Sequence, residues 1–398
     1  MPDRRKLLIL CAVFMLLLSG CWSSREIEDL ALYAGLALDS GQPAPVEKGF
    51  EAKGAHYAKR NKIMATIQVV PTKSVGTKDK KEHETQMPYT NVSGSGDSLL
   101  EIFRQFSIRL DRPVIGHHLK VIIISADLLR KQNIRQLLDF TLRDNDIRPS
   151  TMVYVSEGPA KDTLVSSQAN EVPAFHIRGM LRNQSRTSKV LPQVTLSRLD
   201  GWTHAKKSFV LQNLVTANGE TELSGGGIIK GSTGHWIGAL SQEDTQCLVW
   251  LRGDGKAGVI KTEDENKEPL TYEIKSVKSK IVPVIKGDHI AFRVELATEG
   301  RLMETWSEEA TPSTEEFAEE MSGLLEKRLE QMMKTLMRRL QTEYKADVAG
   351  FGDKLAVEQP AAWKRLKENW DGVFSTAEIT FQYKVKITDF GSFTEEDS

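Results

Sequence analysis

The sequence is poor in cysteine and lacks the short motifs of common catalytic and cofactor sites. No HExxH, CxxC, GxSxG or GK[ST] pattern occurs in its 398 residues. The formal charge of −1 gives no basis for nucleic-acid binding through bulk charge. The sequence therefore predicts no catalytic, metal-binding or cofactor-binding residues, and it favours a role other than that of an enzyme.

Two local patterns still need weighing as possible sites. His117 and His118 are adjacent, and neighbouring residues on a strand point to opposite faces, so the pair is not expected to chelate one metal. The glycines in GSGDS, residues 94–98, could form a phosphate loop, but Ser98 followed three residues later by Glu101 is typical of a helix capping box. We therefore expect a structural role for both patterns.

The N-terminus combines a basic start, an apolar run and a cysteine. Arg4, Arg5 and Lys6 precede the twelve residues 7–18, far fewer than the roughly 20 that a membrane-spanning helix needs. The following Leu-Ser-Gly-Cys, residues 18–21, resembles a bacterial lipobox. We expect residues 1–20 to be a lipoprotein signal peptide and Cys21 to be lipidated; the alternative is an ordinary signal peptide with an incidental cysteine.

Cysteine counting then excludes an intrachain disulfide. Of the three cysteines, Cys11 would leave with the signal peptide and Cys21 would carry lipid, so Cys247 has no partner. Cys247 lies in CLVWL, a segment for which we expect a short helix capped by Ser241 and a buried, neutral thiol.

The first half alternates between strand and helix patterns, which predicts a mixed βα domain over residues 21–156. The expected strands are 32–38, 63–70, 120–125 and 151–156, and the expected helices begin at Ser98 and lie within 128–142. Residues 157–224 show weak periodicity. We interpret them as a connector or small middle domain with one or two short helices.

Residues 225–393 have a different pattern and predict a C-terminal α+β domain. A hairpin turning at Gly231–Gly234 precedes the Cys247 helix, and an antiparallel meander follows, broken at Pro283 and at residues 286–289. A long amphipathic helix, residues 314–344 with a cap at Ser313, should pack on this sheet. Trp363 and Trp370 should share one helix side, and residues 379–387 should add a closing strand. The predicted fold class is multi-domain α+β, with an antiparallel C-terminal sheet packed on a long helix.

Several segments together resemble the Ger(x)C family, the lipoprotein C subunits of spore germinant receptors. They are CWSSREIEDLALYAGLALD, HHLKVIIIS with LLDFTLRDNDIRPS, WIGALSQEDTQCLVWLRG, and LQTEYKADVAGFGDKL with PAAWKRLKENWDGVF. The resemblance implies a non-enzymatic receptor subunit held by Cys21 on the outer face of the spore inner membrane. It also implies assembly with an A and a B subunit of the receptor.

The main alternative is a lipid-anchored solute-binding protein of a transporter. That class requires two similar βα lobes around a ligand cleft, which the unlike halves of this sequence do not favour. A third reading, a cell-envelope hydrolase, lacks a nucleophile or metal motif.

Overall fold

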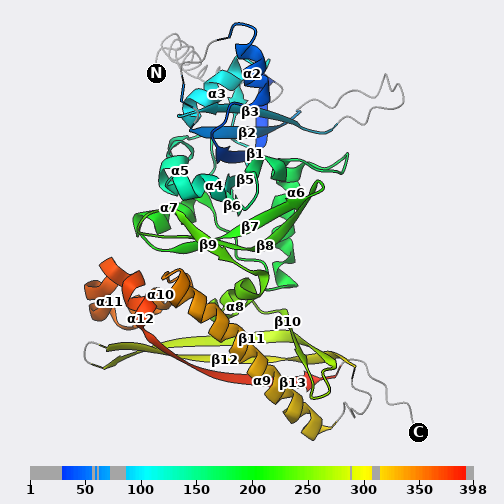
Figure 1. Ribbon diagram of the computed structural model, residues 1–398, viewed down its shortest axis with the longest axis vertical. Helices are drawn as coiled ribbons and strands as arrows, with labels where there is room; N and C mark the ends of the chain where they lie inside the picture. Colours follow the sequence, from blue (N-terminus) through cyan, green and yellow to red (C-terminus); the bar gives the residue numbers. More distant parts are fainter. Residues whose placement is uncertain are drawn as a thin grey trace, which may run out of the picture.

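The protein contains two sheets that lie at opposite ends of the molecule (Figure 1). The computed structural model describes residues 29–55, 59–60, 62–71, 87–286, 289–306 and 314–390. The first sheet has the strand order β3-β2-β1-β5-β6-β7-β8-β9, and β4 pairs with β1. Its strands are β1 Ala31–Ser40, β2 Ile63–Val70, β3 Thr90–Gly96, β4 Val114–Ile115, β5 Val121–Ser125, β6 Met152–Ser156, β7 Phe209–Ala217, β8 Glu220–Ile229 and β9 Trp236–Leu240.

This first sheet is parallel in the middle and antiparallel at both ends. The pairs β1–β5, β5–β6 and β6–β7 are parallel, whereas β1–β2, β2–β3, β7–β8 and β8–β9 are antiparallel. On β5, Ile122 and Ile124 enter one apolar core and Val121 and Ile123 enter another. The apolar run VIIIS therefore forms a strand that is buried on both faces, as expected for parallel sheets covered by helices.

Helices cover both faces of this sheet. They are α2 Pro45–Glu51, α3 Leu99–Ser107, α4 Ala126–Lys131, α5 Ile134–Arg143, α6 Pro173–Met180 and α7 Leu196–His204, with 3₁₀ turns η2 Ala160–Leu164 and η3 Leu181–Ser185. The Ser98 side chain accepts a hydrogen bond from the Glu101 N–H, so the predicted helix cap is confirmed. Gly94 and Gly96 lie against the side chains of Ile102 and Phe106, and a larger residue would disturb this close packing.

The structure corrects the interpretation of residues 157–224 as a connector. Strands β7 and β8 belong to the first sheet, where β7 pairs with β6 and with β8. The predicted hairpin turn at Gly231–Gly234 is present, but β9 extends the same sheet and does not join the C-terminal one. The part of the chain that forms the first sheet therefore continues to the end of β9 at Leu240, past the domain boundaries expected at 156 and 224.

The second sheet has the order β10-β11-β12-β13, and its strands are β10 Gly258–Glu263, β11 Pro269–Lys286, β12 His289–Thr305 and β13 Glu378–Asp389. Two expectations are corrected here. Pro283 does not break the ladder, because β11 runs through it and pairs it with Phe292. The closing strand β13 joins β12 in parallel, so the sheet is antiparallel in its first two pairs only.

The long predicted helix is confirmed as α9 Glu315–Arg338, followed by the π-helical turn η4 Arg339–Glu343. Its N-cap is Thr314, whose side chain accepts from the Phe317 N–H, whereas Ser313 lies outside the described residues. After it come α10 Phe351–Glu358, α11 Pro360–Leu366, the 3₁₀ turn η5 Lys367–Asn369 and α12 Trp370–Thr376. The buried side chains of α9 face the sheet: Met321, Leu325, Leu329, Met332, Met333, Leu336 and Met337.

Helix α8 Gln242–Arg252 lies between the two sheets (Figure 1). One apolar cluster contains Val210 and Ile228 of the first sheet, Cys247 and Trp250 of α8, and Phe292 of the second sheet. Ser241 caps α8 as predicted, in a capping box with Asp244. Because α8 is packed on both sides, the two sheets share a continuous core.

Candidate functional site

The predicted lipidation residue, Cys21, lies outside the described residues, so its modification stays a prediction. The described chain begins at Asp29, eight residues later. Among the described residues, no helix is both long and apolar enough to cross a bilayer.

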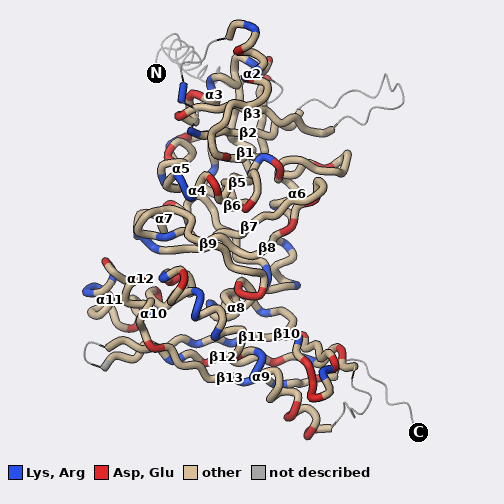
Figure 2. The backbone as a smooth tube through the Cα atoms, in the orientation of Figure 1, with Lys and Arg blue, Asp and Glu red and all other residues tan. Residues whose placement is uncertain are grey.

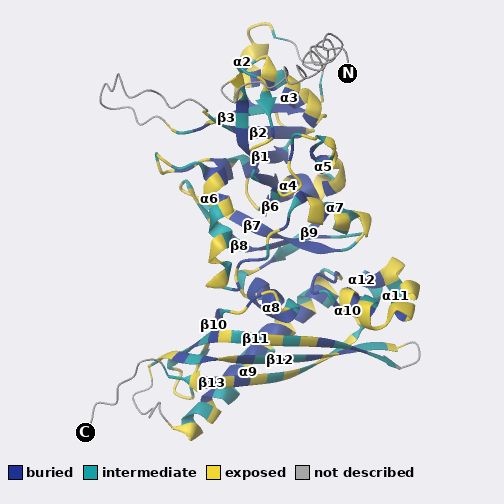
Figure 3. Cartoon of the chain, turned by 180° about the vertical axis from the view of Figure 1, so that it is seen from behind, coloured by how far each residue is buried: buried dark blue, intermediate teal, exposed yellow. Residues whose placement is uncertain are grey.

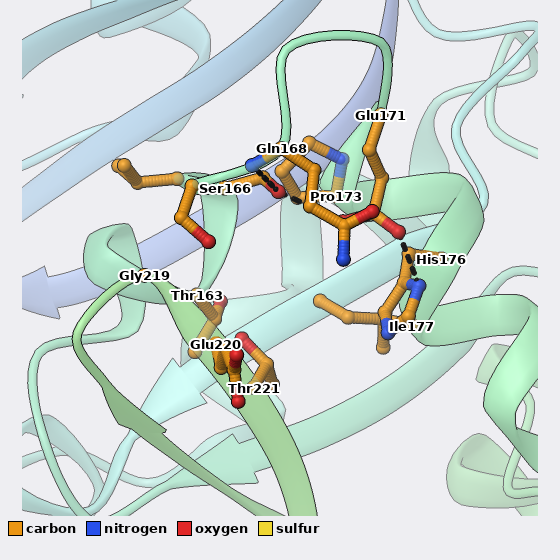
Figure 4. A pocket seen from close by; sticks show the side chains of 12 residues that line it. Thr163, Ser166, Gln168, Glu171, Pro173, His176, Ile177, Gly219, Glu220 and Thr221 are labelled. Atoms are coloured by element: carbon orange, nitrogen blue, oxygen red, sulfur yellow. Dashed lines mark hydrogen bonds and ion pairs between the residues drawn. The ribbon is translucent and has the colours of Figure 1, made fainter.

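A polar pocket of about 250 Å³ lies between α6, η2 and the β7–β8 turn (Figure 4). The His176 ring nitrogen Nδ1 is 2.5 Å from Glu171 Oε1, and the Ser166 hydroxyl donates to Glu171 Oε2 at 2.8 Å. Ser166 also accepts a hydrogen bond from the Gln168 N–H at 3.0 Å. A serine, a histidine and a carboxylate therefore meet, although the sequence shows no nucleophile motif.

The order of these groups does not activate a nucleophile. A serine hydrolase requires the histidine between the hydroxyl and the carboxylate, so that the imidazole can take the serine proton. Here Glu171 lies in the middle and accepts from both neighbours, so its carboxylate holds Ser166 and His176 in place. The arrangement is a closed hydrogen-bond cluster that stabilises the loop before α6.

A second, larger hollow of about 710 Å³ lies beside α3 and α5. Tyr33 and Phe103 stack in its wall with ring centroids 5.5 Å apart, and Arg104, Asp139 and Asp144 contribute charges of both signs. Burial raises the pKa of the Tyr33 hydroxyl, and the charge of Asp144 adds to that shift. The hollow therefore has an apolar wall and a rim of mixed charge, with no constellation that defines a reaction.

An ion pair joins the turn after α9 to helix α8, which lies between the two sheets. Arg339 forms an ion pair with Asp244 of α8, whose side chain is only 5% exposed, and it also donates to the Tyr344 hydroxyl at 3.1 Å. Tyr344 in turn donates to the Ala239 carbonyl of β9 at 2.7 Å. The π-helical turn that carries Arg339 thus bonds to α8 and to the first sheet.

A second polar contact centres on Asp371 at the start of α12. Its Oδ2 lies 2.9 Å from Lys230 Nζ and accepts from the Ser208 hydroxyl at 2.7 Å, and both of these residues belong to the first sheet's loops. Its Oδ1 accepts from the Asp347 N–H at 3.0 Å. We call the residues Asp244, Arg339, Tyr344, Lys230 and Asp371 the inter-sheet joint.

Asp347 is buried next to this joint and accepts five hydrogen bonds. Its Oδ1 accepts from the backbone N–H groups of Ala349, Gly350 and Phe351 at 2.8–3.2 Å. Its Oδ2 accepts from Gly352 N–H and from the indole of Trp370, both at 2.7 Å. Burial raises the pKa of Asp347, and the hydrogen bonds oppose that shift. With donors on every side, the site suits a carboxylate and leaves no acceptor for a carboxyl proton.

Among the described residues, no group of three or more His, Cys, Asp and Glu side chains is placed to hold a metal. His117 lies 3.5 Å from Asp146, on the exposed surface. Cys247 is fully buried, and burial raises the pKa of its thiol, which confirms the prediction of a neutral buried cysteine.

Sequence reasoning did not find the joint, because its members are spread over 141 positions, from Lys230 to Asp371, and have no motif in common. The neighbouring Asp347, in contrast, has a signal in the sequence. The aspartate precedes two glycines in DVAGFG, and Gly350 takes a positive φ of 90°, a conformation that glycine adopts readily.

Comparison with known proteins assigns the family. A family model described as "Spore germination protein N-terminal domain" matches residues 23–215, and one described as "Spore germination B3/ GerAC like, C-terminal" matches residues 224–391. The chain is 38% identical to spore germination protein YndF of Bacillus subtilis (strain 168) over 390 residues, which cover 97% of this chain and 96% of that protein. It is 30% identical to spore germination protein B3 of the same organism, covering 95% and 96% of the two chains.

A solved structure agrees with this assignment. The crystal structure of the GerBC protein matches with a TM-score of 0.61 and 26% identity, covering 82% of this chain and 93% of that one. The chain therefore belongs to the GerAC-like family of spore germination proteins, which confirms the expected Ger(x)C resemblance. Its two sheets also differ in strand number and order, unlike the paired lobes expected for a solute-binding protein.

Proposed function

We propose that this chain is the lipid-anchored, non-enzymatic C subunit of a nutrient germinant receptor. Cys21 holds it on the outer face of the spore inner membrane, beside the A and B subunits. The observation that carries the proposal is the ordered match of both family models along almost the whole chain, beginning at residue 23, two positions after Cys21. The position of Glu171 between Ser166 and His176, where no imidazole can take the serine proton, supports the proposal that the chain is not an enzyme.

The anchor is tested by Cys21→Ala in spores, with Cys247→Ala as the matched cysteine control. A diacylglyceryl group supplies two acyl chains, which stable membrane attachment requires. We expect wild type and Cys247→Ala in the membrane fraction, and Cys21→Ala either unprocessed or released, with germination impaired. Membrane retention of Cys21→Ala after removal of the leader would contradict the lipid anchor.

The partner and ligand parts need separate measurements. Affinity purification of the lipidated protein from spores should recover an A-type and a B-type receptor subunit together with it. Calorimetric titration of the purified chain with amino acids, sugars and nucleosides should show no binding by the isolated subunit. Saturable binding of one solute, without receptor subunits in the purified material, would favour the solute-binding alternative.

A further inference from the structure

Exposed apolar side chains lie at the end of the molecule where the described chain begins. The Ala31 N–H donates to the Pro113 carbonyl at 2.9 Å, and β1 pairs with β4 directly after this contact. Pro113, five residues after Ile108, therefore lies beside the start of β1. Cys21 precedes Ala31 by ten residues, so even a fully extended chain keeps the two within roughly 35 Å.

Two helices contribute to this end of the molecule from opposite faces of edge strand β3. Phe106 of α3 packs on Gly94, whereas the Ser95 hydroxyl of the same strand donates to Glu47 of α2 at 2.6 Å. Arg109 reaches around the strand edge. Its Nη1 donates to the Ser93 carbonyl at 2.6 Å, and its guanidinium carbon lies 5.7 Å from the Phe50 ring centroid.

The side chains on this end are unusually exposed for apolar residues. Ile108 is 80% exposed, Val46 41% and Phe50 39%, and the residues around α2 and α3 are exposed in Figure 3. We call Val46, Phe50, Ile108 and Arg109 the anchor-proximal surface. Exposed apolar groups gathered on one surface mark a contact with a protein or with a membrane.

The charge around this surface differs from that of the whole chain. Residues 45–55, 59–60, 62 and 97–113 hold eight basic and five acidic side chains, a net charge of +3, whereas the chain carries −1. Figure 2 shows basic residues on and between α2 and α3. Glu47 and Lys59 are both buried in an ion pair at 2.5 Å and do not face outward, and leaving out both keeps the net charge at +3. The local excess of positive charge suits a surface of anionic lipid headgroups.

We propose that the anchor-proximal surface lies on the bilayer, with Ile108 and Phe50 inserted among anionic headgroups. This inference rests on the proposed lipidation of Cys21, because the lipid is what keeps this end near the membrane. Shallow apolar insertion beside basic residues adds to the hold of the acyl chains. The second sheet, at the opposite end of the molecule, then points away from the membrane (Figure 1).

The test compares two equally exposed positions on the lipidated full chain. Ile108→Cys and Val357→Cys replace side chains that are 80% and 79% exposed, and Val357 lies in α10 with the second sheet. In the lipidated protein a thiol-reactive fluorophore reaches only the introduced cysteine, because Cys247 is buried and the diacylglyceryl group blocks the Cys21 thiol. Each protein is placed in phosphatidylglycerol or phosphatidylcholine vesicles that contain a headgroup-linked nitroxide quencher.

We expect severalfold stronger quenching at position 108 than at 357 in phosphatidylglycerol, and weaker quenching at 108 in phosphatidylcholine. Phe50→Glu in the Ile108→Cys background should weaken the quenching at position 108 further. Equal quenching at both positions in vesicles that carry the protein would overturn the inference. It would also be overturned if position 108 were protected from the thiol reagent only in receptor complexes from spores, because a protein partner would then cover this surface. Mass spectrometry of the N-terminal peptide and vesicle flotation report the lipid separately, so failure of the anchor itself is distinguishable.

Discussion

Replacing Asp347 by alanine should produce one of the largest losses of stability available in the C-terminal half. The carboxylate accepts four backbone N–H groups and the Trp370 indole, and the residue is 3% exposed. Each buried donor left without an acceptor costs about 1–3 kcal/mol, so five donors at the low end amount to about 5 kcal/mol. That loss is comparable with the whole unfolding free energy of many domains, about 5–15 kcal/mol.

Asparagine at the same position provides a graded comparison. Asp347→Asn keeps the oxygen that accepts three of the bonds, but it directs an NH₂ group at the Gly352 N–H and the indole. Two lost bonds predict about 2 kcal/mol, or more if the facing donors repel. Asp353→Ala is the control, because Asp353 is 62% exposed and its ion pair with Lys207 should contribute less than about 1 kcal/mol.

The measurement is urea unfolding of the purified chain, followed by circular dichroism and by tryptophan fluorescence. We expect the order of midpoints to be wild type and Asp353→Ala highest, Asp347→Asn lower and Asp347→Ala lowest. Equal midpoints for Asp347→Ala and Asp353→Ala would refute the reasoning from hydrogen-bond count. Equal losses for alanine and asparagine would show that the negative charge, and not the number of acceptors, stabilises the turn.

Three further predictions concern buried groups. Burial raises the pKa of the Cys247 thiol above its ordinary 9.0, so only the unfolded chain releases this proton near pH 9, and the free energy of unfolding falls as the pH rises from there. Between pH 8 and pH 10, wild type should lose about 1.4 kcal/mol more unfolding free energy than Cys247→Ala. Parallel pH profiles of the two proteins would contradict this. Trp370→Ala should cost about 3–5 kcal/mol and Trp363→Ala about half of that, because Trp370 is buried and Trp363 is half-buried, which melting temperatures will check. Glu47→Ala leaves the buried Lys59 ammonium without its carboxylate and should cost about 3–5 kcal/mol, so an unchanged thermal transition would show that water reaches this pair.

Local patterns in the sequence predicted most elements of the structure. Strand β2 spans residues 63–70 as expected, and α8 and α3 begin after their predicted caps Ser241 and Ser98. The long helix α9 follows its apolar periodicity, and Cys247 is buried as its apolar neighbours indicated. These features depend on side chains within a few residues of one another, so a single sequence carries them.

Such local patterns did not predict which strands pair with one another. The segment at 157–224 has weak periodicity, yet β7 and β8 find their places in the first sheet through pairing with β6 and with each other. The β12–β13 pair is parallel because α9 to α12 carry the chain back across the sheet before β13 begins. Both outcomes depend on residues far apart along the chain.

The sequence by itself predicted the buried Cys247, the anchor at Cys21 and the caps and periodicities of the helices, because each depends on neighbouring residues. The family resemblance came from several such segments in a fixed order along the chain. Only the tertiary structure decided that Arg339 meets Asp244, that Glu171 stands between Ser166 and His176, and that Pro113 lies beside the start of β1. Such contacts join segments that are brought together by burial of apolar surface in the two sheets. That burial is cooperative and non-directional, and no short stretch of sequence specifies it alone.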